Sequence, residues 1–140
     1  MTANAAALAA TVILLFTMGY FFLASPAFLL VKLDIPQVSQ LLRGMFNIQF
    51  VMMSVAGVLG TLAFAVAGHP AFAIGVGLVA AFAILGRRWF MDKMDAQLNA
   101  RDSGDRDAVR RLRRLHWAGM LCNAVLLVAF VSSIPHVASI

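Results

Sequence analysis

The sequence predicts an all-α integral membrane protein, a bundle of four membrane-spanning helices. Every charged side chain falls within two short windows, Lys32 to Arg43 and Arg87 to Arg114. The stretches outside these windows, residues 1–31, 44–86 and 115–140, contain no Asp, Glu, Lys or Arg. A helix needs about 20 mostly apolar residues to cross a hydrocarbon core of about 30 Å. The first and last stretches therefore fit one span each, and the middle stretch fits two.

The first predicted span covers residues 5–31. Pro26 lies about one turn before its end and lacks a backbone N–H, so we expect a bend or a freed carbonyl there. A secretory signal begins with a positively charged segment, and residues 1–11 carry no charge. The first span is therefore expected to be an anchor that is retained.

The second and third spans are separated by the sequence Gly68-His69-Pro70. Gly commonly follows the last turn of a helix and Pro is tolerated in the first turn, so these residues predict spans over 45–67 and 70–86. The second helix is expected to start before its span, with Asp34 as N-cap and Pro36 in the first turn.

Small residues recur along the second span at spacings of four, three and four. They are Ala56, Gly60, Ala63 and Ala67. Such a seam lets two helix backbones approach closely where lipid supplies no hydrophobic drive for association. We expect the seam to pack helices within the chain, and packing between chains is the alternative.

The fourth span is predicted over residues 115–134, and the segment before it continues as helix. Apolar residues keep helical spacing on both sides of a break at Asn99 to Asp105. Helices over about 70–99 and 105–134 would each be about 45 Å long. Residues 87–114 are therefore predicted to form a basic helical hairpin outside the membrane.

The two arms of this hairpin carry opposite charges that suit ion pairs. Asp92 and Asp95 lie on the first arm, and four arginines lie on the second. We expect Asp92 and Asp95 to pair with those arginines, although exposed pairs of this kind contribute only about 0 to 1 kcal/mol.

The basic residues also predict the orientation. All eleven lie in the first and third loops, and short cytoplasmic loops collect Lys and Arg. We therefore expect a multi-pass protein of a bacterial inner (plasma) membrane, with both termini outside and the hairpin in the cytoplasm. Six arginines are expected to meet anionic headgroups, each adding about 1 kcal/mol of attraction. They are Arg87, Arg88, Arg110, Arg111, Arg113 and Arg114.

The placement of charge argues against several classes of function. The net charge of +5 belongs to one face of a membrane protein, which does not favour nucleic acid as a partner. No predicted span holds a carboxylate, which disfavours a proton antiporter and a catalytic triad. A single Cys and three dispersed His do not form a zinc motif.

Polar side chains inside the spans form one cluster when they are placed by depth. Asn47 and His116 lie at the rim on the charged side, and Ser25, Gln49 and Asn123 lie one to two turns deeper. His116 and Asn123 are seven residues apart and hence share a face of the fourth helix. Buried amides are costly in lipid, so these groups are expected to bond inside the bundle. The cluster is either a clamp between helices one, two and four or a cytoplasm-facing ligand pocket.

Metal or haem binding is an alternative that rests on fewer residues. His116, Met120 and Cys122 are weak candidates for copper or haem, because thioether and thiolate groups suit soft ions. Methionine also fills gaps in ordinary helical cores. His69 and His136 are both predicted on the outer face, where they would meet at a metal or haem edge or simply be solvated. No cofactor is assigned from the sequence.

Four segments resemble a known family: Gly19 to Phe28, Leu42 to Phe46, Met94 to Asp102, and Arg114 to Asn123. They are similar to a small four-span membrane family catalogued as a domain of unknown function and related to eukaryotic transmembrane proteins linked to platinum-drug resistance. The resemblance implies a four-helix membrane bundle and a role for His116 and Asn123. A weaker similarity is to copper-resistance membrane proteins and to four-span protoporphyrinogen oxidases.

The sequence therefore predicts a non-enzymatic membrane protein that acts by binding. It would serve as an accessory or assembly subunit, associating with itself or another membrane protein through the helix-two seam, or bind a small ligand at the polar cluster. The alternatives are a copper- or haem-binding redox or metal-handling protein and, with least support, an oligomeric transporter.

Overall fold

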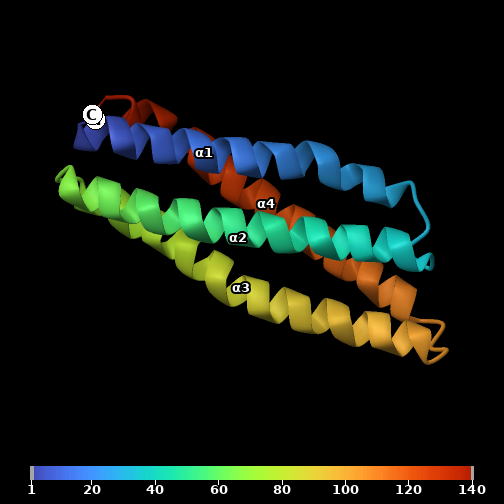
Figure 1. The fold of residues 1–140 in the computed structure, drawn as a ribbon. Coiled ribbons are helices and arrows are strands. Elements are labelled where there is room, and N and C mark those ends of the chain that lie inside the picture. Colours follow the sequence, from blue (N-terminus) through green and yellow to red (C-terminus); the bar gives the residue numbers. More distant parts are fainter. Residues whose placement is uncertain (1, 140) are drawn as a thin grey trace.

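A computed structural model describes residues 2–139 and contains four long α-helices (Figure 1). They are α1 (Ala3–Ala24), which continues into a short 3-10 helix η1 (Ser25–Leu29), then α2 (Pro36–Val66), α3 (Pro70–Asp102) and α4 (Ala108–Val137). Each of the four is long and apolar enough to span a membrane. The predicted all-α architecture with four candidate spans is confirmed.

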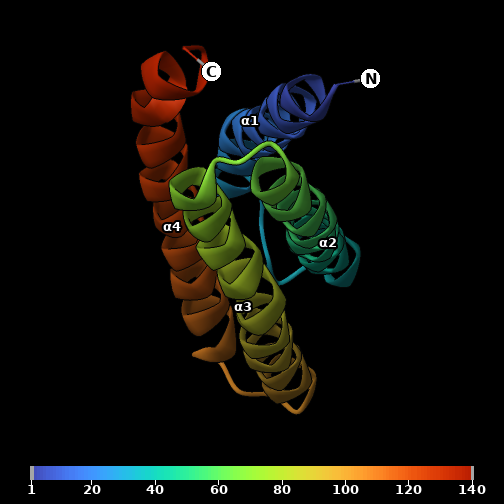
Figure 2. The ribbon, with the colours of Figure 1, turned by 90° about the vertical axis from the view of Figure 1, so that its left-hand side faces the viewer.

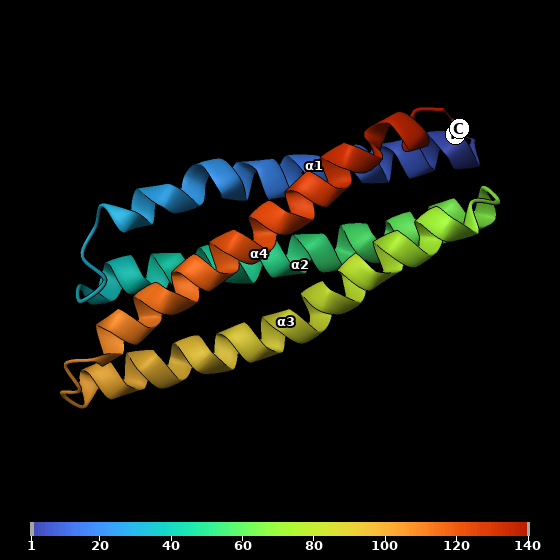
Figure 3. The same cartoon turned by 180° about the vertical axis from the view of Figure 1, so that it is seen from behind.

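The helices alternate in direction, so the start of α1, the α2–α3 turn and the end of α4 lie at the same end of the bundle (Figures 1 and 2). The opposite end holds the η1–α2 loop and the α3–α4 loop (Figure 1). It is called the charged end, because all the charged residues lie on its side of the bundle, from the middle of α3 outward. Helix α2 lies beside α1 and α3. Helix α4 runs obliquely, from beside α3 at the charged end towards α1 at the other end (Figure 3).

The first helix ends earlier than the predicted span over 5–31. Its α-helical part stops at Ala24, and the chain then makes one 3-10 helix before the loop. Pro26 is the physical reason, because it has no N–H to continue the i to i−4 ladder. The α1–η1 junction places Ser25 at the point where the helix changes type.

The second helix begins at Pro36, as expected, but Asp34 is not its cap. Ile35 occupies the N-cap position and contributes no side-chain hydrogen bond. The helix ends at Val66, and Gly68 then adopts a φ of +79°, a conformation that glycine reaches without steric cost. Pro70 starts α3 directly after this turn.

Helix α3 ends three residues later than predicted, and α4 both begins and ends three residues later than predicted. The break expected at Asn99 to Asp105 lies at residues 103–107 instead, and Gly104 reverses the chain with a φ of +93°. Helix α4 continues through Pro135 to Val137. Both helices therefore extend well beyond the uncharged segments, as the hairpin prediction requires.

The small-residue seam of α2 packs against both of its neighbours. Gly60 faces α1 and α3 together, since a Cβ there would lie 3.1 Å from Val76 Cγ1 and 3.2 Å from Ala10 Cβ. Gly57 is closer still, because its Cβ would lie 2.8 Å from that of Ala80. Ala56 is buried, and Ala63 and Ala67 are half-buried towards the end of the helix. The seam is thus used for packing within the chain, and the adjacent Gly57, which is outside the predicted seam, makes the closest approach to α3.

Candidate functional site

The polar cluster contains two separate hydrogen-bonded groups, and the first joins η1 to α4. His116 Nε2 lies 2.8 Å from Ser25 Oγ and 3.1 Å from the Ser25 carbonyl oxygen. A carbonyl only accepts, so this geometry assigns the proton to Nε2, which donates to Ser25. Both residues are fully buried. Among residues 2–139, His116 Nδ1 has no hydrogen-bond partner and so keeps its lone pair.

The second group joins α1, α2 and α4 about two turns deeper. Gln49 Nε2 donates to Asn123 Oδ1 at 3.0 Å, and Asn123 Nδ2 donates to the Met18 carbonyl at 3.0 Å. Gln49 also approaches Met53 Sδ at 3.3 Å. The two amide side chains are 7% and 5% exposed, so each hydrogen bond lies in an apolar interior. This arrangement links the three helices that the sequence predicted.

Asn47 does not belong to the cluster, although the sequence placed it there. Its Oδ1 accepts a hydrogen bond from Arg87 Nε of α3 at 2.8 Å. Asn47 and Gln49 are two residues apart and therefore point to different sides of α2, a distinction that an estimate of depth alone does not make. Asn47 instead serves the α2–α3 contact.

Aromatic rings pack between the two hydrogen-bonded groups. The Phe46 ring lies 4.9 Å from the Phe21 ring and 6.0 Å from the His116 ring, in edge-to-face geometry. Gly119 of α4 faces Phe46 so closely that any Cβ would overlap the ring. The cavity beside Gln49 and Asn123 measures about 20 Å³, which is room for about one water. The interior of the cluster has no space for a larger ligand.

The three candidate metal ligands do not line one common hollow. Met120 lines a shallow groove of about 180 Å³ between α1 and α4, whereas Cys122 lines the small cavity beside Asn123, and His116 lines neither. Residues 2–139 contain no cluster of three His, Cys, Asp or Glu side chains with a geometry for a metal ion. A haem is also far larger than the space beside Asn123. The set His116, Met120 and Cys122 shares no cavity, and copper or haem binding by these residues stays a prediction.

The two histidines at the other end of the bundle occupy different environments. His69 precedes the first residue of α3, and its ring lies 6.3 Å from the Phe72 ring. His136 lies in the last turn of α4 and is exposed. No interaction joins them in the part of the chain that the structure describes.

A groove of about 590 Å³ lies between α1 and α2. It lies in the half of the bundle nearer the charged end and is open to the outside of the bundle. Its walls are mainly apolar, with Phe16, Phe28, Met45 and Met52 among them, and its polar groups are Thr17, Tyr20, Gln40 and Gln49. Gln49 lines both this groove and the small cavity beside Asn123. The groove is therefore next to the polar cluster.

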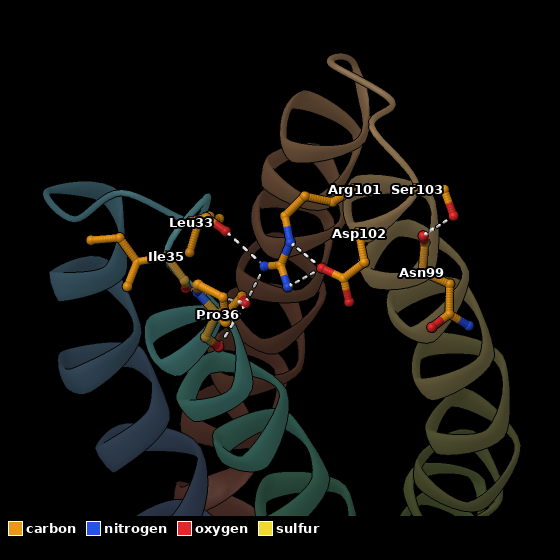
Figure 4. Close-up of polar contacts among 8 residues, drawn as sticks. Leu33, Ile35, Pro36, Asn99, Arg101, Asp102 and Ser103 are labelled. Carbon is orange, nitrogen blue, oxygen red and sulfur yellow. Dashed lines mark hydrogen bonds and ion pairs between the residues drawn. The ribbon is translucent and has the colours of Figure 1, made fainter.

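The charged end is cross-linked by arginines that the sequence did not single out. Arg101 of α3 donates to the Leu33 carbonyl and to Ser39 Oγ, and it pairs with Asp102 at 2.9 Å (Figure 4). The Arg101 side chain is only 11% exposed. It thereby fixes the loop before α2 to the end of α3.

Ion pairing at this end differs from the predicted pattern. Asp95 pairs with Arg43 of α2, through Arg43 Nη2 at 2.9 Å and a second bond from Nε, and not with an arginine of α4. These hydrogen bonds from Arg43 hold the pKa of the Asp95 carboxyl below its usual range. Asp92 makes no ion pair with α4 among the described residues. The prediction considered only the two arms of the hairpin, whereas α3 packs more extensively against α2 than against α4.

The basic residues expected at the membrane surface divide into two groups. Arg111 donates to Gln97 and pairs with Asp105, and Arg113 donates to the carbonyls of Phe28 and Val31, so these two stabilise the bundle. Arg88 and Arg114 are exposed and have no hydrogen bond or ion pair within residues 2–139. Arg110 is exposed with one long ion pair, at 3.8 Å from Asp107.

Helix α4 is the least enclosed of the four. Within the most apolar 18 residues of each helix, 11% are buried in α4, against 28% in α3 and 39% in α1 and in α2. Its exposed face carries Trp117, Leu121, Val125 and Val128, each more than half exposed. A cavity of about 210 Å³ also separates α4 from α3 in the half away from the charged end.

Fold and site together define a multi-pass membrane protein with four apolar helices and a closed internal hydrogen-bond cluster. No protein-family model, curated protein or solved structure matches the chain. The family relationship suggested by Arg114 to His116 and Asn123 therefore stays a prediction.

Proposed function

We propose that this protein is a non-enzymatic membrane protein that binds a small, mainly apolar ligand in the α1–α2 groove. The observation that carries the proposal is the groove itself, with about 590 Å³ of space, apolar walls and a few polar groups. Ligand sites in proteins are usually hollows of about 300–1,000 Å³ with this composition. The closed polar cluster would then support the groove and hold Gln49 in place.

The proposed setting is a bacterial inner membrane with both termini outside and the charged end in the cytoplasm. The support is the location of all eleven basic residues at one end of the bundle. In this orientation the α1–α2 groove lies in the cytoplasmic half of the bilayer. A ligand would enter from that leaflet.

Gly44 offers a direct test, because it lines the groove and its Cβ would meet no atom within 4 Å. Gly44→Leu should fill the groove without displacing the bundle. Gly19→Leu is the matched control, since a Cβ on Gly19 also meets nothing within 4 Å and Gly19 does not line the groove. Native mass spectrometry of protein released gently from its own membranes measures the bound small molecules.

The expected result is a bound non-lipid mass on the wild-type protein and on Gly19→Leu, and its loss from Gly44→Leu. A wild-type protein that carries only phospholipid would overturn the proposal. So would equal retention of the small molecule by the two glycine variants.

A second candidate function is that of an accessory or assembly subunit that docks through α4. The observation favouring it is the low burial of α4 and the exposed stripe Trp117, Leu121, Val125 and Val128. The seam of α2 no longer serves this role, because it packs inside the chain. A photo-crosslinking residue at Val128, which is 66% exposed, should capture a protein. The same residue at Leu78 of α3, which is 67% exposed, should capture only lipid, and equal capture at both positions would reject α4 docking.

A further inference from the structure

A second groove, between α2 and α3, combines apolar walls with two arginines. It has a volume of about 320 Å³ and is lined by Val51, Ser54, Val55, Ile84, Arg87 and Arg88. No acidic residue lines it. From this combination we infer that the groove binds an anionic phospholipid, with the phosphate at the two arginines and an acyl chain along the valines and the isoleucine.

The two guanidinium groups are available for an anion. Arg87 uses only Nε, in its hydrogen bond to Asn47, and within residues 2–139 no hydrogen bond or ion pair engages its two Nη nitrogens. Arg88 is exposed and has no partner in the described chain. Asn47 fixes the orientation of Arg87, which lowers the conformational entropy lost on binding. Planar guanidinium groups match phosphate oxygens in paired hydrogen bonds.

The depth of the arginines suits a lipid headgroup. They follow the uncharged stretch 44–86 directly, and the next residue, Trp89, is 51% exposed. Tryptophan is enriched at the membrane–water interface, so Trp89 marks the headgroup level. Below it, Val51, Val55 and Ile84 are 39%, 55% and 46% exposed on segments that face lipid.

The chemistry favours a lipid with a net negative headgroup. A zwitterionic headgroup carries an ammonium group, and the groove is lined by two arginines and no carboxylate that would stabilise it. A free anion would gain nothing from the apolar walls, whereas an acyl chain covers them. The occupant is therefore an anionic phospholipid held by both its phosphate and its chain.

The test compares lipid retention in nanodiscs made of equal parts phosphatidylglycerol and phosphatidylcholine. Native mass spectrometry gives the ratio of the two lipids that stay on the released protein. Arg87→Gln combined with Arg88→Gln should lower this ratio about tenfold, since each arginine near the headgroups contributes a several-fold preference. Arg110→Gln combined with Arg114→Gln removes the same charge from two arginines that do not line the α2–α3 groove, so it should lower the ratio clearly less than the Arg87 and Arg88 pair does.

A groove-filling variant tests the apolar half of the site without changing charge. Val55 is exposed in the groove, so Val55→Trp should leave the core intact and still lower phosphatidylglycerol retention. Helical circular dichroism in detergent checks that each variant is folded. If both pairs of arginine substitutions lower the lipid ratio equally, the preference comes from the overall positive charge and not from the groove, and the inference is overturned. Wild-type retention by folded Val55→Trp, or displacement of the lipid by millimolar inorganic phosphate, would also overturn it.

Discussion

The hydrogen bond between Gln49 and Asn123 provides the sharpest test of the polar cluster, because each side chain is replaceable by leucine of similar size. Asn123→Leu removes two hydrogen bonds, one from Gln49 and one to the Met18 carbonyl. Hydrogen bonds between membrane helices contribute about 0.6 kcal/mol on average. The variant also leaves the buried Gln49 amide with only the Met53 sulfur, and an unsatisfied amide costs about 1–3 kcal/mol. We expect a total loss of about 2–4 kcal/mol.

The double variant separates a clamp from a binding pocket. Gln49→Leu alone removes one hydrogen bond and leaves Asn123 Oδ1 without its donor, which costs about 1–2 kcal/mol. In Gln49→Leu combined with Asn123→Leu, no side-chain amide stays unsatisfied at the cluster, so the double variant should be more stable than Asn123→Leu alone. The expected coupling energy is about 1–2 kcal/mol.

The free energy of unfolding of the four proteins, measured in the same detergent or bicelle, gives this coupling directly. The reasoning fails if the two losses are additive, because the side chains would then not be acting on each other. It also fails if both single variants keep wild-type stability while the bound ligand is lost. That second outcome would make the cluster a binding site and not a structural clamp.

Three further predictions concern packing and the charged end. In a thermal unfolding assay, Gly119→Ala should destabilise the bundle by about 1–3 kcal/mol, because the added Cβ overlaps the buried Phe46 ring. Gly44→Ala should be neutral or slightly stabilising in the same assay, because its Cβ meets open space. Arg101→Met should expose the loop over residues 30–35 to protease faster than in the wild type, since Arg101 holds the Leu33 carbonyl and Ser39; an unchanged cleavage rate would contradict this. The pKa of Asp95 in the folded protein is below its unfolded value of about 4, so the ion pair with Arg43 stabilises the fold above that pH, and the contribution is lost as pH falls through the folded pKa. Asp95→Asn should therefore reduce the loss of unfolding free energy on acidification, by at most about 1 kcal/mol at low salt. An identical dependence of stability on pH in the variant and the wild type would refute this.

The spans follow from the sequence because charge and chain length alone decide which segments cross a bilayer. The Gly68 and Pro70 turn was equally predictable, since these residues have few other uses between two apolar helices. The end of α1 was missed by several residues, because an apolar composition continues through η1 and only Pro26 marks the change of helix type. Composition identifies a span but does not show where its helix ends.

The site was predictable where depth and helix face agree. Gln49, His116 and Asn123 lie where a count along each helix placed them. Ser25 was predicted at the level of Gln49 and Asn123 but bonds to His116 instead, and Asn47 has the right depth on the wrong face. The ion pair between Arg43 and Asp95 was missed for a different reason. It joins residues 52 positions apart, and only the packing of α2 against α3 brings them together.

The distribution of polar contacts explains why α4 is held firmly at one end and loosely at the other. In lipid, apolar side chains gain little from burial against each other, so hydrogen bonds and close backbone approach fix the position of a helix. Among the described residues, such contacts between α4 and α1, η1 or α2 fall between Arg113 and Asn123. Arg113 donates to the Val31 carbonyl, His116 bonds to Ser25, Gly119 packs against Phe46, and Asn123 bonds to Gln49. Beyond Asn123 the buried side chains of α4 are only Phe130 and Val137, and the 210 Å³ cavity separates this half from α3. Contacts within the chain therefore do not fix how far this half of α4 lies from α3, and a partner helix or a lipid chain could cover it. For this reason the second candidate function places docking on α4 and not on the tightly packed seam of α2.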